Sequence, residues 1–214
     1  MKEKCILVCA AMDSECGYIK KFLDLEEIGK NLFKKDNVVL VQTGYGKVNA
    51  AMGTQKGFAL YDIKEVINYG FVGSLTEKYR IGDYVLPQVT FQHDFDLTPL
   101  GAKEYEVLEQ EESFFKINEN EKITDYFTTA KKSQFLLTGD RFLTEKIGNF
   151  DDAICDMEGY SVARVAYDYG VPVSLIKMVS DSCVKDGAED FFATIETKRE
   201  ELQRHLSDYI NSIK

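Results

Sequence analysis

Short apolar runs alternate with amphipathic segments along most of this 214-residue chain. Unbroken runs of strand length favour β-strands, and apolar positions three or four apart favour helices. The pattern predicts strands at 4–11, 31–35, 38–43, 65–69, 82–87, 134–138, 153–157 and 173–179. It predicts helices at 15–23, 47–61, 119–132, 159–169 and 190–213.

The order of these segments favours a single α/β domain over residues 1–214. Strands and helices alternate without a linker, a repeat or a low-complexity tract. The run at 173–179 is apolar apart from Ser174 and Lys177, as expected for a central strand buried on both faces.

Glycine and polar residues mark the expected breaks between these elements. We predict a glycine turn at 70–74, a tight turn at 43–46 and a loop at 181–189. Asp13 or Ser14 is expected to cap the first helix. Residues 102–121 are acidic and only weakly periodic.

Composition narrows the classes of partner. The net charge is −10, so the phosphate backbone of a nucleic acid would be repelled. No apolar run is long enough to span a membrane. The five cysteines form no C-x-x-C pair and there are only two histidines, so no metal site is expected. We interpret the cysteines as reduced thiols of a cytoplasmic protein.

Three carboxylates stand where predicted strands end. Glu15 follows the first strand, Glu158 follows the strand at 153–157, and Asp181 follows the strand at 173–179. Ligands of α/β sheets bind at the carboxyl ends of strands. Carboxylates gathered there can bind a polar ligand, activate water and protonate a leaving group. Alternatively, Glu15 only favours a helix N-terminus and Asp181 only caps a loop.

Several short motifs follow one another along nearly the whole chain. They are Ala11-Met12 with Glu15, Thr43 to Val48, Ile67 to Gly70 with Gly73, Gly82-Asp83, His93-Asp94 with Asp96, Thr98 and Gly101, Ser133 to Asp140, Met157-Glu158 and Ser180-Asp181. Taken together, the chain resembles the nucleoside phosphorylase and nucleosidase superfamily, most closely its 5′-methylthioadenosine/S-adenosylhomocysteine nucleosidase branch.

This resemblance implies a three-layer αβα fold around a central mixed, partly barrel-like sheet. It implies hydrolysis of the N-glycosidic bond of a purine nucleoside by a homodimer, without a metal or organic cofactor. The implied substrate is a 5′-modified adenosine, methylthioadenosine or S-adenosylhomocysteine.

The resemblance also implies roles for individual residues. Asp181 would share its proton with purine N7, and Glu15 would activate the attacking water. Glu158 would hold the ribose hydroxyls. The remaining substrate-binding residues would be Met12, Tyr45, Phe71, Val72, Gly73, Leu97, Leu100, Phe142, Leu143, Met157, Lys177, Ser180 and Phe191. Of these, Leu97 and Leu100 match the region of the 5′-substituent pocket, partly across the dimer interface.

Three positions depart from the family pattern. Phe71 replaces a small hydroxyl residue and Val72 a common alanine, so the sugar side of the pocket would be narrowed or re-aimed. Lys177 stands where the family usually has an arginine that bridges to the ribose-binding glutamate, and lysine lacks the planar two-pronged geometry. These departures leave two alternatives open. One is a nucleosidase or phosphorylase of the same fold with another nucleoside, and the other is a non-catalytic nucleoside-binding protein.

Overall fold

The computed structural model describes residues 4–183 and 187–213. Its strands are β1 (Lys4–Ala10), β2 (Glu26–Gly29), β3 (Leu32–Lys35), β4 (Val38–Gln42), β5 (Asp62–Ser74), β6 (Tyr84–Gln92), β7 (Phe115–Lys116), β8 (Lys131–Thr138), β9 (Ala153–Asp156) and β10 (Val173–Asp181). Its helices are α1 (Asp13–Phe22), α2 (Lys47–Leu60), the 3₁₀ helix η1 (Thr98–Leu100), α3 (Glu121–Tyr126), α4 (Gly159–Asp168) and α5 (Gly187–Ile213).

Five strands close into a ring. In the ring, β5 pairs with β10, β10 with β6, β6 with β8, β8 with β9, and β9 returns to β5. The sheet continues from β5 through β1, β4 and β3 to β2. Parallel and antiparallel pairs both occur, as in β1 with β5 and β3 with β4. The expected mixed, partly barrel-like sheet is therefore confirmed.

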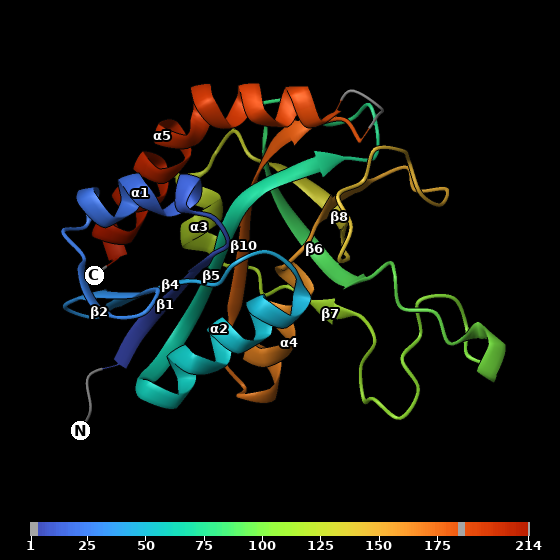
Figure 1. The fold of residues 1–214 in the computed structure, drawn as a ribbon, viewed down its shortest axis with the longest axis horizontal. Coiled ribbons are helices and arrows are strands. Elements are labelled where there is room, and N and C mark those ends of the chain that lie inside the picture. Colours follow the sequence, from blue (N-terminus) through green and yellow to red (C-terminus); the bar gives the residue numbers. More distant parts are fainter. Residues whose placement is uncertain (1–3, 184–186, 214) are drawn as a thin grey trace.

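Helices cover both faces of this sheet, which gives the three expected layers. Figure 1 shows α1, α3 and α5 on one side and α2 and α4 on the other. Successive residues of β1 serve the two sides in turn. Ile6 and Val8 belong to the apolar cluster beneath α1 and α5, whereas Leu7 and Cys9 belong to the cluster beneath α2 and α4. Burial on both faces explains why this strand is apolar without alternation.

The glycine turn predicted at 70–74 is wrong. These residues continue β5 and pair with β10 and β9. The glycines are explained by close packing: a Cβ at Gly70 would lie 2.4 Å from Glu15 Oε1, and one at Gly73 would lie 2.4 Å from Cys183 Sγ. A glycine that makes room for a neighbouring side chain has the same appearance in a sequence as a glycine that breaks a strand.

Several other bounds differ from the prediction. Asp13 and Ser14 lie inside α1, and Met12 precedes the helix as its cap residue. β2 was not predicted, because Glu26–Gly29 is exposed along its whole length and carries no apolar pattern. β6 is longer than 82–87, α3 is shorter than 119–132, and α5 starts at Gly187 instead of 190. Residues 184–186 of the expected loop lie outside the described residues.

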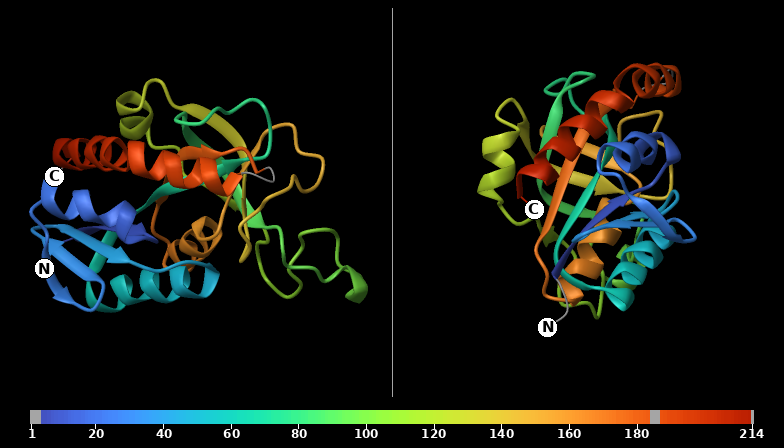
Figure 2. Two further views of the ribbon diagram at one scale, coloured as in Figure 1. Left: turned by 45° about the horizontal axis from the view of Figure 1, so that its top comes forward. Right: turned by 90° about the vertical axis from the view of Figure 1, so that its left-hand side faces the viewer.

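One long segment projects from the body. Residues 93–114, between β6 and β7, contain only η1 as a regular element. This arm extends away from the sheet in Figure 1 and in the left-hand view of Figure 2.

Candidate active site

A cavity of about 240 Å³ lies near the carboxyl ends of β1, β5, β9 and β10. It brings together thirteen of the residues that the sequence singled out, namely Met12, Glu15, Tyr45, Phe71, Val72, Gly73, Phe142, Leu143, Met157, Glu158, Ser180, Asp181 and Phe191. All three candidate carboxylates are among them.

The Glu15 carboxylate is held by backbone N–H groups. Its Oε2 accepts from Ala11 at 2.9 Å and from Met12 at 3.0 Å, and its Oε1 accepts from Phe71 at 3.0 Å. The side chain therefore closes a capping box at the start of α1 while one edge faces the cavity. Burial raises the pKa of Glu15, and the N–H donors and Lys177 oppose that rise. Such a carboxylate is rigidly placed and can accept a proton from water.

Asp181 is the last residue of β10 and is 2% exposed. The Cys183 N–H donates to its Oδ1 at 3.0 Å, and the Ser180 hydroxyl donates to its Oδ2 at 2.9 Å. Burial raises the pKa of Asp181 despite these two donors. A carboxyl group with a raised pKa can hold a proton and deliver it to a leaving group.

Glu158 faces the N-terminus of α2. The Gly46 N–H donates to its Oε1 at 2.8 Å. Burial, followed by the charge of Asp156, raises the pKa of Glu158 to about 8. When such a carboxyl group loses its proton, its carboxylate can accept hydrogen bonds from the hydroxyl groups of a ligand.

Lys177 does not line the cavity and does not bridge to Glu158 as expected. Its ammonium donates to Asp156 Oδ2 at 2.8 Å and to Asn68 Oδ1 at 2.7 Å. The side chains of Lys177 and Asp156 are 2% and 1% exposed, so this ion pair is buried. Asp156 also accepts from the Gly159 N–H and from the Thr138 hydroxyl. The ion pair therefore joins β10, β9 and β5 directly behind the cavity.

Aromatic side chains form the outer wall of the cavity. The rings of Phe142 and Phe191 meet edge to face, with centroids 5.4 Å apart. Phe191 lies in α5 and not in a loop before it. Phe71 is buried in the cavity wall, next to the N–H that it donates to Glu15. A flat heterocycle can stack against such rings.

Leu97 and Leu100 stand apart from this cavity. Both lie on the projecting arm, and Leu100 is 72% exposed. Their expected contact with the 5′ substituent is therefore not made within one chain.

Five lining residues were not predicted: Ala11, Arg141, Cys155, Asp156 and Cys183. Asp156 is directly next to the Met157-Glu158 motif, so its position was a usable signal. Arg141 is exposed and pairs with Glu145, as surface arginines often do. Cys155 and Cys183 carry no motif.

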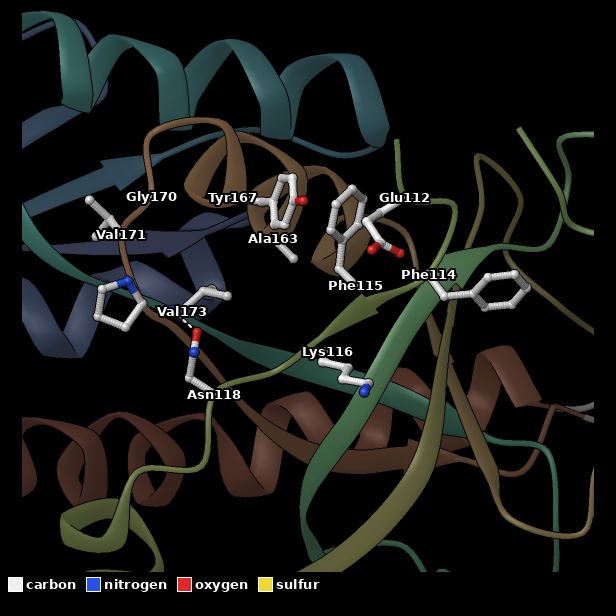
Figure 3. Close-up of a pocket in the computed structure, with 11 residues that line it drawn as sticks. Glu112, Phe114, Phe115, Lys116, Asn118, Ala163, Tyr167, Gly170, Val171 and Val173 are labelled. Carbon is white, nitrogen blue, oxygen red and sulfur yellow. Dashed lines mark hydrogen bonds between the residues drawn. The ribbon is translucent and has the colours of Figure 1, made fainter. Parts of the chain in front are cut away.

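A larger cavity, of about 490 Å³, lies elsewhere (Figure 3). It is bounded by β7, the end of α4 and the start of β10, and Glu112 is the one carboxylate among its lining residues. Volume alone does not identify a catalytic site, and the three grouped carboxylates favour the smaller cavity.

Comparison with known proteins places the chain in a family. The model of the Phosphorylase superfamily matches residues 25–211, so the chain belongs to that superfamily. Among its relatives is the 5′-methylthioadenosine/S-adenosylhomocysteine nucleosidase of Buchnera aphidicola subsp. Acyrthosiphon pisum (strain Tuc7). The two are 29% identical over 212 residues, which cover 92% of this chain and 89% of the relative.

Solved structures agree on the fold. A candidate 5′-methylthioadenosine/S-adenosylhomocysteine nucleosidase from Borrelia burgdorferi B31, with adenine bound, is 31% identical with a TM-score of 0.85. The match covers 96% of this chain and 99% of that one. Futalosine hydrolase of Helicobacter pylori strain 26695 has a TM-score of 0.90 at 22% identity and 98% coverage of both chains.

Two further observations concern cofactors and membranes. Within residues 4–183 and 187–213, no three His, Cys, Asp or Glu side chains are grouped so that they could hold a metal ion. In the same part of the chain, no helix combines the length and the apolar character that crossing a membrane requires.

Replacing Lys177 by methionine should destabilise the protein strongly. Lys177→Met leaves the buried Asp156 carboxylate without its counter-ion, and breaking a buried pair in this way costs about 3–5 kcal/mol. Urea unfolding measures the loss. Lys35→Met removes the exposed pair of Lys35 with Asp24 and should cost much less, because water screens that pair. Equal, small losses for both variants would show that the buried pair does not stabilise the fold.

Replacing Glu158 by glutamine should stabilise the unliganded protein increasingly as pH rises. Between pH 4.5 and about 8, the folded wild type retains a proton on Glu158 that the unfolded chain releases, so wild-type stability falls across that window. Glu158→Gln carries no such proton. The difference in melting temperature between variant and wild type should therefore grow from pH 5 to pH 8.

The control for this measurement is Glu196→Gln, which changes an exposed carboxylate on α5. Its difference from wild type should stay constant over the same pH range. A pH-independent difference for Glu158→Gln would mean that the pKa of Glu158 is not raised.

Proposed function

We propose that the chain hydrolyses the N-glycosidic bond of a 5′-modified adenosine, such as methylthioadenosine or S-adenosylhomocysteine, and releases adenine. The observation that carries this proposal is the set of three carboxylates around one cavity: Glu15 and Asp181 are buried, and Glu158 is half-buried. The nucleosidase relative and the related structure with bound adenine support the same reaction. The five cysteines, interpreted from the sequence as reduced thiols, favour action in the cytoplasm.

Each carboxylate has a separate task in the reaction. Asp181 donates a proton to the purine N7, so that the base leaves as a neutral molecule. The sugar carbon then develops positive charge, which the nearby carboxylates stabilise. Glu15 takes a proton from the water that attacks this carbon, and Glu158 holds the ribose hydroxyls.

Two contacts support water over phosphate as the nucleophile. The N-terminus of α2 could bind an anion through its N–H groups. The Gly46 N–H instead donates to Glu158, and the Lys47 N–H donates to Asp140 Oδ1 at 2.7 Å. Two carboxyl groups of the chain itself thus occupy these donors, which leaves fewer N–H groups for a phosphate ion.

A second candidate is the same reaction on another nucleoside. Phe71 fills space at the sugar side of the cavity where a small residue is expected. The similarity in fold to a futalosine hydrolase makes a different substituent on the sugar the first variation to test. A non-catalytic nucleoside-binding protein is less well supported, because binding alone does not require three carboxyl groups with raised pKa values around one cavity.

We further propose that the protein is a homodimer. Val48, Met52 and Leu60 lie on one stripe of α2 and are 50–68% exposed. Such a stripe on a folded domain marks a contact surface. The arm that carries Leu97 and Leu100 projects beyond the body of its own chain, where it could reach a second copy (Figure 2). Association would then bring these leucines to the 5′ end of the partner's cavity.

The first test is the release of free base from methylthioadenosine, S-adenosylhomocysteine, futalosine, adenosine and inosine, with and without phosphate. We expect adenine from the first two without phosphate. Asp181→Asn should lower kcat by about 10²–10⁴, since it removes the general acid. Asp168→Asn, which changes an exposed residue at the end of α4, is the matched control. A decrease of less than tenfold would exclude Asp181 as the acid. Base release only with phosphate would overturn hydrolysis, and release of no base would favour a binding protein.

The dimer predicts a mass of twice 24.4 kDa in light scattering. The double variant Val48→Glu, Met52→Glu should elute as a monomer, because four buried charges would face each other at the contact. Relative to wild type, its KM should rise more for methylthioadenosine than for adenosine. Ile81→Glu, at an exposed position outside α2, should remain dimeric. A monomeric wild type would refute the proposal.

A further inference from the structure

Two thiols face each other in the wall of the catalytic cavity. The Sγ atoms of Cys155 and Cys183 are 3.1 Å apart, and both residues line the cavity. They are 7% and 1% exposed. Neither takes part in the reaction described above. The two residues are separated by 28 positions in the sequence, so the contact is made by the fold.

The register of three strands brings these thiols together. Gly73 of β5 pairs with Cys155 of β9 on one side and with Asp181 of β10 on the other. A Cβ at Gly73 would lie 2.4 Å from Cys183 Sγ and 3.1 Å from Cys155 Sγ. Because Gly73 has no side chain, both sulfur atoms can occupy the space that a Cβ at this position would need.

The distance between the sulfur atoms is close to that of a bond. A disulfide has an S–S length of about 2.05 Å, so the two atoms need to approach by about 1 Å. Rotation of two side chains and a small shift of the segment after β10 can supply this movement. Cys183 has a φ of +50°, and its N–H donates to Asp181 Oδ1. Any shift of Cys183 toward Cys155 therefore acts directly on the carboxyl group of the proposed general acid.

We propose that Cys155 and Cys183 form a reversible disulfide when a peroxide enters the empty cavity, and that this bond switches off turnover. The effect on turnover rests on the proposed function, whereas formation of the bond does not. Hydrogen peroxide is much smaller than the nucleoside for which we propose this cavity of about 240 Å³, so it can enter the same cavity. A bound purine would cover the thiols and protect them.

The chemistry balances with one peroxide for each disulfide. The Cys183 sulfur attacks one peroxide oxygen, the O–O bond breaks, and Cys183 sulfenic acid and one water form. The Cys155 sulfur then attacks the sulfenic sulfur, the S–O bond breaks and a second water leaves with the Cys155 proton. Two thiols have then been oxidised and one peroxide has been reduced. The contact with Cys183, followed by burial, raises the pKa of Cys155.

The test exposes the purified protein to hydrogen peroxide, alkylates the remaining thiols and digests it without reduction. Mass spectrometry should find the peptides of Cys155 and Cys183 joined, with the mass of two hydrogens lost. Base release should fall at least tenfold and return after dithiothreitol. Adenine added before the peroxide should slow both changes.

Three variants separate this pair from other thiols, each compared with its own untreated activity. Cys155→Ala and Cys183→Ala should form no joined peptide. Any activity that these variants lose to peroxide should not return after dithiothreitol. Cys9→Ala changes a buried thiol that contacts Thr54, and it should behave like wild type.

Each contrary result has a distinct meaning. Oxidation of Cys183 to sulfinic acid without a joined peptide would overturn the disulfide. A joined peptide in a fully active enzyme would overturn the switch but not the nucleosidase. A protein without turnover before treatment, but with the joined peptide afterwards, would overturn the nucleosidase and leave the disulfide standing.

Discussion

The buried ion pair of Lys177 with Asp156 is the interaction on which the site depends. It links β10 to β9, and through Asn68 to β5, where an uncompensated charge would be costly. Asp156 also connects this ion pair to α4, because it accepts a hydrogen bond from the Gly159 N–H at the start of that helix. Met157 and Glu158 lie between Asp156 and Gly159 in the sequence. Glu158, the carboxylate proposed to bind the ribose, therefore lies beside a chain of contacts that begins at Lys177.

The same lysine sets the electrostatic balance of the cavity. Burial favours the protonated form of all three carboxyl groups. The charge of Lys177 is among the causes that oppose the rise in pKa at Glu15 and Glu158. At Asp181, the rise in pKa is opposed mainly by hydrogen bonds from Cys183 and Ser180. The charge of Lys177 is thus among the causes that act on the proposed base and the proposed ribose ligand, whereas hydrogen bonds act on the proposed acid. Groups whose surroundings differ in this way can divide into base and acid.

The residues that the sequence singled out gather around one cavity, although the sequence misplaced parts of the strands around it. Glu15, Glu158 and Asp181 follow apolar runs, and the end of a buried strand can be recognised in a sequence because polarity changes there. Asp156 was not among the predicted site residues: it lies inside the run that predicted β9, and its contact with Lys177 is made by the fold. The turn predicted at 70–74 failed for a related reason. Gly70 and Gly73 are small because Glu15 and Cys183 pack against them, and such long-range packing leaves no local pattern.

Lysine at position 177 changes which element controls Glu158. An arginine could reach two carboxylates with its planar fork, whereas the ammonium of Lys177 is committed to Asp156 and Asn68. The Glu158 carboxylate is met instead by the Gly46 N–H, at the N-terminus of α2. That helix also carries the exposed stripe of Val48 and Met52. Under the proposed homodimer, a partner that packs on this stripe would contact the same helix whose N-terminus meets Glu158, and the proposed association and the proposed ribose site would then be linked through α2.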